Sequence, residues 1–224
     1  MPDFEIGPIP PQVDAAILEK LVQAEVATIG HWRLWGFCDT GIRRVEPGAA
    51  IVGTAITVSC PVGDNSALHY AIGLVRPGDI LVVERQGDRN VACLGDTVAR
   101  AALKAGARAL VLDGPCTDVQ GIRAAQVPVW CRGVSGRTTI VQGRGGRVNV
   151  PVSVGGVVVM PGDALLCDDN GVLVLNPAEA GTEAVKAVER QARSEAILQK
   201  IENGASLPEL SGAKAAFEKA MAQS

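Results

Sequence analysis

Aromatic side chains are scarce in this chain, since Phe, Trp and Tyr make up only 3% of its 224 residues. The core must therefore be filled by Val, Leu, Ile and Ala, and the apolar fraction of 47% is enough for one large domain. The chain also lacks a net positive charge: its net charge is −3, and no basic run is interleaved with aromatic residues. We therefore expect no nucleic-acid partner.

Long apolar runs are missing as well. No stretch reaches the roughly 20 residues that a membrane-spanning helix needs, so we expect no membrane partner. The N-terminal segment MPDFEIGPIPPQVD lacks the basic start and apolar run of a secretory signal. None of the cysteines forms a CxxC pair, and without an export signal we expect reduced thiols in a cytoplasmic protein. The six are Cys38, Cys60, Cys93, Cys116, Cys131 and Cys167.

The stretch Leu94–Asp118 is predicted to be one helix and one strand with a polar loop at each end. Small and apolar residues recur at helical spacing between Thr97 and Ala105, and Gly106 is a typical residue to follow a helix. Asp96 is predicted to cap this helix at its start. The apolar run ALVL then indicates a short buried strand, and the loop DGPCTD follows it.

These loops carry residues that suit a binding site. The start of a helix presents free backbone N–H groups, which bind small anions such as carboxylates. Asp96, Asp113 and Asp118 are three carboxylates that the loops can bring together around a hard divalent cation. The alternative is structural, with aspartates that only cap helices and form turns, and the local pattern alone favours it. Cys116 lies in the same loop, but with only two histidines in the chain we do not favour a cysteine nucleophile.

A family resemblance changes this balance. Asp96 is followed, after twenty residues, by Thr117-Asp118, which resembles the Asp-x20-Arg-Asp signature of the RraA-like family. Gly41–Val58, Pro61–Val83 and Val148–Leu175 are similar to that family in order and spacing. The family includes class II pyruvate aldolases acting on 4-hydroxy-4-methyl-2-oxoglutarate and 4-carboxy-4-hydroxy-2-oxoadipate. It also includes RraA, a protein regulator of ribonuclease E.

The resemblance implies an α/β chain with the RraA-like β/β/α layered fold, a mixed sheet and flanking helices. We expect this domain over residues 1–207 and a C-terminal helical extension over residues 208–224. Three Pro-Gly turns, each followed by a Val/Leu/Ile-rich run, independently indicate a curved mixed sheet. Outside the central stretch, periodicity predicts a helix over Val13–Val26 and a long helix over Pro177–Asn203.

The resemblance also implies a site between the subunits of a homotrimer or hexamer. Asp118 would bind Mg²⁺ or Mn²⁺, and the catalytic residues would be Asp96, Thr117 and, from the adjacent subunit, Glu195. Glu195 is almost as readily an ordinary surface residue, and Asn65 is alternatively a helix cap. The residues implied to bind the substrate are Asn65, Leu94, Gly95, Asp96, Thr97 and Val98.

Two departures from the family pattern affect the predicted chemistry. Thr117 stands where the aldolases have Arg, and Gly121 stands where they have an acidic residue. A neutral hydroxyl does not replace a guanidinium, so we expect poor cleavage of the aldolases' usual substrates. If cleavage runs at ordinary enzyme rates, Arg100, Arg123 and Arg132 are the candidates for the missing charge. We expect a divalent-metal-dependent lyase, of aldolase or decarboxylase type, acting on a small 2-oxo acid through a pyruvate-like enolate. The alternatives are a non-catalytic regulator acting by protein–protein binding and an enzyme of the same fold with a different substrate.

Overall fold

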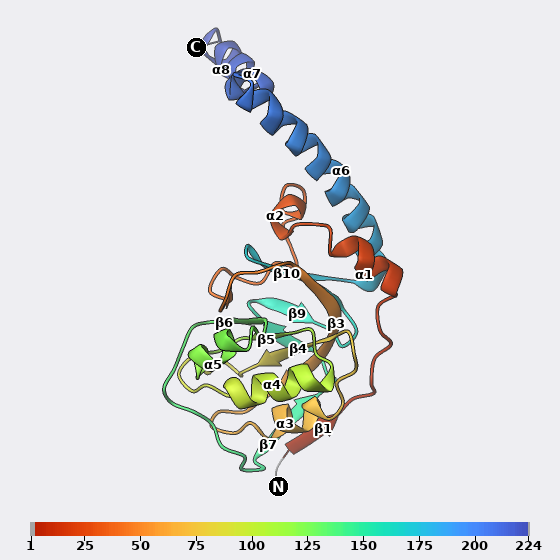
Figure 1. The fold of residues 1–224 in the computed structure, drawn as a ribbon, viewed down its shortest axis with the longest axis vertical. Helices are drawn as coiled ribbons and strands as arrows, with labels where there is room; N and C mark the ends of the chain where they lie inside the picture. The colour runs from red at the N-terminus through yellow and green to blue at the C-terminus, as the bar shows by residue number, and fades with distance from the viewer. Residues whose placement is uncertain (1–2, 224) are drawn as a thin grey trace.

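A nine-stranded mixed sheet forms the centre of the computed structural model, which describes residues 3–223 (Figure 1). A separate two-stranded ribbon, β8–β9, lies on one side of it and helices lie on the other. The strands are β1 (Asp3–Ile6), β2 (Arg43–Arg44), β3 (Ile51–Ser59), β4 (Asp79–Glu84), β5 (Ala109–Leu112), β6 (Val129–Cys131), β7 (Gly145–Val148), β8 (Val152–Val154), β9 (Val157–Val159), β10 (Ala164–Asp168) and β11 (Gly171–Leu175). The helices are α1 (Ala15–Leu21), α2 (Val26–Ile29), α3 (Ser66–Ile72), α4 (Asp96–Ala105), α5 (Val119–Ala124), α6 (Pro177–Glu202), α7 (Leu207–Leu210) and α8 (Ala213–Met221).

Four neighbouring strands, β3, β4, β5 and β6, run parallel and are connected by α3, α4 and α5. Parallel neighbours need such crossover connections, which here place the three helices on one face of the sheet. Antiparallel partners extend the sheet, since β10 and β7 pair with β3, β11 pairs with β10 and β2 pairs with β6. Strand β1 pairs in parallel with β7 at one edge. The expected mixed sheet with flanking helices is therefore confirmed.

Side-chain alternation along β4 explains the layers. Leu81 and Val83 point into a core shared with α3, α4 and α5, whereas Ile80 and Val82 contact the β8–β9 side. Successive residues of a strand face opposite sides of a sheet, so a strand buried on both faces is apolar throughout. The fully buried Trp130 of β6 fills part of the core on the β8–β9 side of the sheet.

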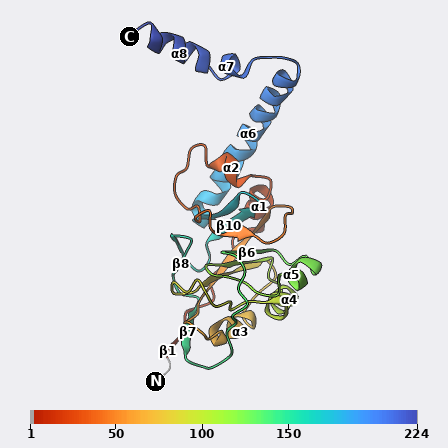
Figure 2. The same cartoon turned by 90° about the vertical axis from the view of Figure 1, so that its left-hand side faces the viewer.

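The long helix α6 is the expected one, and it leaves the domain. Asn176 caps it by accepting a hydrogen bond from the Ala178 N–H at 2.9 Å. Its first turns bury Ala180, Ala184 and Ala187 against α1 and α2. Beyond this contact α6 projects away from the sheet and carries α7 and α8 at its far end (Figures 1 and 2). The range predicted for the extension, residues 208–224, contains α8 and all of α7 except Leu207, and Ser224 lies outside the described residues.

The single helix expected over Val13–Val26 is wrong. Helix α1 ends at Leu21, and a second short helix, α2, begins at Val26. The Val26 N–H donates to the Asp168 carboxylate at 3.0 Å, which ties the start of α2 to the β10–β11 turn. This tertiary contact overrides the local periodicity. Among residues 3–223, no helix combines the length and the apolar character that crossing a membrane requires.

Candidate functional site

The candidate site lies where two loops meet beyond the carboxyl ends of the parallel strands. One loop leads from β4 to the start of α4, and the other leads from β5 to the start of α5. They are joined by the Thr117 N–H, which donates to the Leu94 carbonyl at 2.9 Å. Ligands of parallel α/β sheets commonly bind at this edge, because the connecting loops and the helix starts converge there.

The start of α4 presents unpaired backbone donors. Helix hydrogen bonding begins with the Ala99 N–H, which donates to the Gly95 carbonyl at 2.9 Å. The N–H groups of Asp96, Thr97 and Val98 consequently have no partner among the described residues. The helix dipole adds partial positive charge at the same place, so this end of α4 suits a carboxylate.

Asp96 does not cap α4, so that prediction is wrong. The cap position belongs to Gly95, and Asp96 is the first helical residue. Its carboxylate instead accepts a hydrogen bond from Arg100 Nε, one turn along the same helix, at 2.5 Å. Arg100 also donates to the Gly121 carbonyl at 3.2 Å, so its guanidinium joins the starts of α4 and α5.

Gly121 makes this arrangement possible. A Cβ atom at this position would lie 2.6 Å from the Asp96 Cγ, which is too close for any real contact. The position where the aldolase pattern has an acidic residue is thus occupied here by the Asp96 carboxylate and its Arg100 partner. The spacing of four residues between Asp96 and Arg100 is the sequence signal for this ion pair.

Asp118 is the carboxylate that remains free. It is exposed, and its side chain has no hydrogen-bond or ion-pair partner among residues 3–223. Its backbone is left-handed, with a φ of 53°, which is uncommon for a residue other than glycine and often marks functional sites. A Cβ atom at Gly95 would overlap the Asp118 Oδ2 atom, so the carboxylate lies directly against the backbone that starts α4.

Asp113 is not part of this site, which corrects the expectation of three converging carboxylates. One of its oxygens accepts from Arg132 Nε and the other from the Gly155 N–H at 2.9 Å. Arg132 also pairs with Asp39 at 2.5 Å and holds the pKa of that carboxyl down at about 2. Within the described part of the chain, no three His, Cys, Asp or Glu side chains are grouped so as to hold a metal ion.

Asn65 lies at the start of α3, which follows the end of β3 at the same edge of the sheet. It does not cap with its side chain; Asp64 does, by accepting from the Ser66 N–H at 2.9 Å. The Asn65 amide nitrogen lies 3.0 Å from His69 Nε2, whereas its oxygen is buried without a partner. A buried amide oxygen without a partner is an acceptor that a ligand group can satisfy.

Glu195 is not brought to this site within one chain. It is exposed on α6, roughly 27 Å along the helix axis from Pro177. Residues 192–200 of α6 are all exposed, and the far part of this helix projects away from the domain that carries α4 (Figure 1). Only a neighbouring copy of the chain can therefore place Glu195 beside Asp96.

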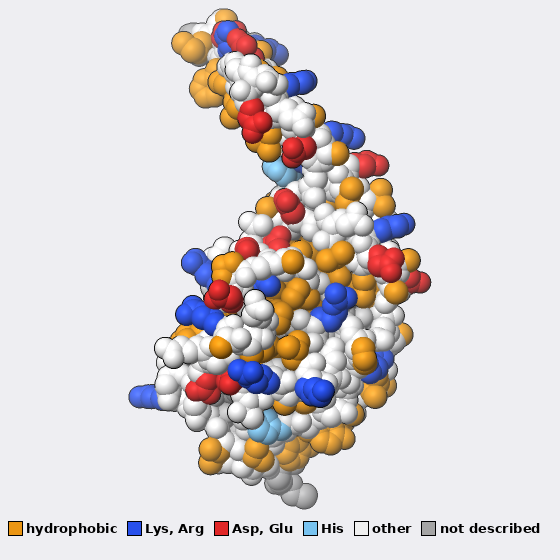
Figure 3. Space-filling view, in the orientation of Figure 1, with side chains coloured by type: hydrophobic (Ala, Val, Ile, Leu, Met, Phe, Trp, Pro, Cys, Tyr) orange, Lys and Arg blue, Asp and Glu red, His pale blue; other side chains and the backbone are white. Residues whose placement is uncertain are grey.

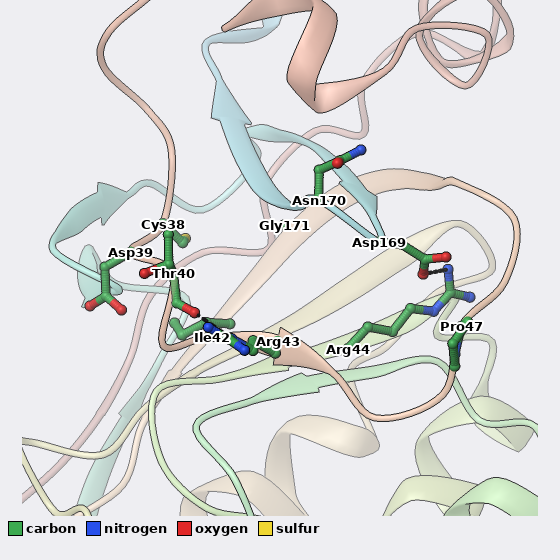
Figure 4. A pocket seen from close by; sticks show the side chains of 10 residues that line it. All are labelled: Cys38, Asp39, Thr40, Ile42, Arg43, Arg44, Pro47, Asp169, Asn170 and Gly171. Carbon is green, nitrogen blue, oxygen red and sulfur yellow. Dashed lines mark hydrogen bonds and ion pairs between the residues drawn. The ribbon is translucent and has the colours of Figure 1, made fainter.

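A depression of about 410 Å³ opens elsewhere, between β2 and the β10–β11 turn (Figure 4). Arg44 lines it but is already engaged, since it pairs with Asp169 at 3.3 Å and stacks on Trp130 at 4.7 Å. Asp39, on the opposite wall, is held by Arg132. With most of its charges paired within the chain, this depression is a weaker candidate than the free Asp118 carboxylate.

On the face that carries α4 and α5, Lys and Arg lie among acidic side chains rather than in one basic patch (Figure 3).

The fold and the site together define a layered α/β protein with a helix N-terminus and a free carboxylate at the edge of its parallel strands. The chain belongs to the RraA-like family, described as Aldolase/RraA, whose model matches residues 25–174. The family resemblance of the sequence is thus confirmed. The matched region includes both loops of the candidate site but ends before Glu195.

Relatives with assigned names point in two directions. The chain is 35% identical over 158 residues to a Halalkalibacterium halodurans protein provisionally named 4-hydroxy-4-methyl-2-oxoglutarate aldolase, covering 69% of this chain and 73% of that one. It is 27% identical to the crystal structure of Streptomyces coelicolor RraAS2, an unusual member of the RNase ES inhibitor RraA family. That match has a TM-score of 0.74 and covers 84% of this chain and 98% of that one. An uncharacterised Pseudomonas syringae protein, 24% identical with a TM-score of 0.76 over 92% and 97% of the two chains, shares the fold.

Proposed function

We propose that this protein is a divalent-metal-dependent lyase of aldolase or decarboxylase type that acts on a small 2-oxo acid. The observation that carries the proposal is the free Asp118 carboxylate lying against Gly95, the residue directly before the unpaired N–H groups that start α4. A site for a cation and a site for a substrate carboxylate are therefore adjacent. The provisional aldolase name of the Halalkalibacterium halodurans relative supports this reaction class.

The donor set fits Mg²⁺ or Mn²⁺. These ions prefer oxygen ligands and commonly bind through one or two carboxylates with waters and substrate completing the coordination. Asp118 provides one exposed carboxylate without a competing partner, and the missing side chain of Gly95 leaves room for it. When bound, the metal would act as a Lewis acid on the 2-oxo group.

The helix start would bind and orient the substrate. The N–H groups of Asp96, Thr97 and Val98 would donate to the carboxylate next to the 2-oxo group, helped by the helix dipole. The hydrogen bond from the Thr117 N–H to the Leu94 carbonyl would keep these N–H groups and Asp118 at a fixed separation. The buried, unpaired Asn65 oxygen would accept a substrate hydroxyl hydrogen.

Arg100 would supply part of the positive charge that Thr117 lacks. Its guanidinium lies between the starts of α4 and α5 and is oriented by Asp96. A cation at this position would stabilise the negative charge that develops on the enolate. The Asp96 carboxylate neutralises much of this charge, so we expect slow turnover of 4-hydroxy-2-oxo diacids. Asp96 would also serve to orient a water for proton transfer.

We further propose that the protein assembles as a homotrimer or hexamer. Helix α6 projects from the domain and carries Glu195 away from the chain's own site, so a neighbouring site is the place where this carboxylate can act (Figure 1). Large apolar side chains are exposed along the same arm, on Ile197, Leu198, Leu207, Phe217 and Met221. Exposed apolar surface of this kind is typical of a subunit contact.

A regulatory function is the second candidate. The absence of a three-residue metal-ligating group among the described residues and the neutral Thr117 favour a protein that binds a partner without catalysis. The similarity to RraAS2, a member of a family of RNase ES inhibitors, also favours a regulatory function. An enzyme of the same fold with a different substrate is a third reading, because Thr117 and Gly121 alter the wall of the site.

The experiment that separates these functions compares Asp118→Asn with Glu19→Gln, which removes an exposed carboxylate on α1. Mn²⁺ affinity is measured by titration calorimetry, and cleavage of oxaloacetate and of a 4-hydroxy-2-oxo diacid is measured at saturating Mn²⁺. We expect Asp118→Asn to lose most metal binding and turnover, because the site offers no second free carboxylate, and Glu19→Gln to keep both. Equal Mn²⁺ binding in the two variants would remove Asp118 from the metal site. No turnover by a wild-type protein that binds Mn²⁺ would favour the regulator or the altered substrate.

A further inference from the structure

Two cysteine sulfurs meet next to the loop that carries Asp118. Cys116 immediately precedes Thr117 and Asp118, and Cys131 is the last residue of β6. Their Sγ atoms are 3.5 Å apart, although fifteen positions separate them in the sequence. Both thiols are free, and both residues are buried.

We propose that Cys116 and Cys131 are a reversible oxidation site, which a small peroxide converts to a disulfide, and that this modification weakens metal binding at Asp118. The disulfide itself does not depend on the proposed function. Its effect on the metal does, since it assumes that Asp118 is a ligand.

The surroundings of Cys131 favour its reaction with a peroxide. The hydrogen bond that it shares with the Cys116 thiol lowers the pKa of Cys131 to about 7, while the same interaction raises the pKa of Cys116. Cys131 also lines an open depression of about 410 Å³, together with Arg123 and Arg132. The thiolate is the reactive form of cysteine, and a small oxidant can reach it through this opening.

The chemistry balances with hydrogen peroxide as the only co-reactant. The Cys131 thiolate, having lost its proton to solvent, attacks one peroxide oxygen and forms a sulfenic acid as the O–O bond breaks and hydroxide leaves. The Cys116 sulfur then attacks the Cys131 sulfur, the S–S bond forms, and the hydroxyl leaves with the Cys116 proton as water. Two thiols are oxidised by two electrons, and one peroxide is reduced to two waters.

The bond changes the loop that carries Asp118. A disulfide has an S–S length of about 2.05 Å, so the two sulfurs must approach each other by about 1.5 Å. Cys116 is held to the segment after β6 by two backbone bonds, from its N–H to Gly133 O and from the Ser135 N–H to its carbonyl, each 2.9 Å. These bonds tie Cys116 to the segment that follows Cys131, so closing the gap between the sulfurs shifts both segments. Thr117 and Asp118 are the next residues in the chain after Cys116 and shift with it. We expect the separation between Asp118 and the start of α4 to change.

The test exposes the purified protein to hydrogen peroxide and maps its disulfides by peptide mass spectrometry. We expect a loss of about 2 Da, a cross-link between Cys116 and Cys131, and full reversal by dithiothreitol. The rate should rise with pH, because the thiolate is the form of cysteine that attacks a peroxide. Mn²⁺ affinity, measured by calorimetry, should fall at least tenfold on oxidation and recover on reduction.

Three variants make the result specific. Cys131→Ser and Cys116→Ala should each prevent the cross-link and the loss of Mn²⁺ affinity, with circular dichroism reporting that they are folded. Cys38→Ser should retain both. Cys38 is only partly exposed, and its partial burial together with the neighbouring Asp113 raises its pKa to about 12. A protein without the cross-link, at peroxide concentrations that oxidise an unstructured dithiol peptide, overturns the oxidation site. A cross-linked protein with unchanged Mn²⁺ affinity overturns the claim that the disulfide weakens metal binding at Asp118. A reduced protein that binds no Mn²⁺ refutes the proposed function instead.

Discussion

Gly95→Ala tests whether the contact between Asp118 and the start of α4 matters for metal binding. Gly95 has φ −127° and ψ −169°, an extended backbone that alanine also adopts, so the substitution adds no backbone strain. The new Cβ would overlap Asp118 Oδ2 and lie 2.9 Å from Thr117 Cγ2. Because Asp118 is exposed, its carboxylate can turn into solvent to relieve the overlap.

The expected magnitudes separate stability from function. Alanine is a poorer residue than glycine at a helix N-cap, and this should lower the free energy of unfolding by about 0.5–1 kcal/mol. Misplacing the carboxylate should weaken Mn²⁺ binding by about 10–100-fold, as changes around a metal ligand typically do. That loss corresponds to about 1.4–2.8 kcal/mol of binding free energy.

The assay is Mn²⁺ titration calorimetry together with urea unfolding of the apoprotein. Gly136→Ala is the matched control, because a Cβ there meets no atom within 4 Å and its φ is not left-handed. We expect Gly136→Ala to bind Mn²⁺ as wild type does. If Gly95→Ala also binds Mn²⁺ with wild-type affinity, Asp118 does not hold the metal against the start of α4 and the geometry of the site is refuted.

Two further predictions concern the missing charge and the assembly. Thr117→Arg should raise kcat/KM for a 4-hydroxy-2-oxo diacid by up to about 10²-fold, since an added guanidinium stabilises the enolate, although Gly121 offers it no acidic partner. Steady-state kinetics showing wild type already at ordinary enzyme rates would mean that Arg100 suffices. Light scattering should give the mass of a trimer or a multiple of it. Steady-state kinetics should show that Glu195→Gln lowers kcat more than it lowers the affinity for the metal. A monomer would remove Glu195 from the site.

Much of the fold was predictable because its signals are local. Helical spacing together with Gly106 located α4, and the helix-favouring residues from Pro177 onward located α6. The break between α1 and α2 was not predictable, because it depends on the hydrogen bond from Val26 to Asp168, 142 positions away. Periodicity carries no information about such long-range contacts.

The candidate site was predictable in outline but not in its pairings. The family spacing placed Asp96 and Asp118 in adjacent loops, and the structure brings these loops together through Thr117 and Leu94. The spacing in the sequence could not show that Asp113 is paired with Arg132, since Arg132 comes from the end of another strand. The closeness of the Cys116 and Cys131 sulfurs likewise arises only when β5 and β6 pair.

Enolate formation is tested by following the methyl protons of pyruvate by NMR, with the protein and diamagnetic Mg²⁺ in deuterated water. An enzyme that forms a pyruvate-like enolate exchanges these protons even when it cleaves the larger substrate slowly. We predict loss of the methyl signal with wild-type protein, dependence of the rate on Mg²⁺, and no loss with Asp118→Asn. Retention of the methyl signal by wild-type protein that calorimetry shows to be Mg²⁺-bound would contradict the proposed lyase.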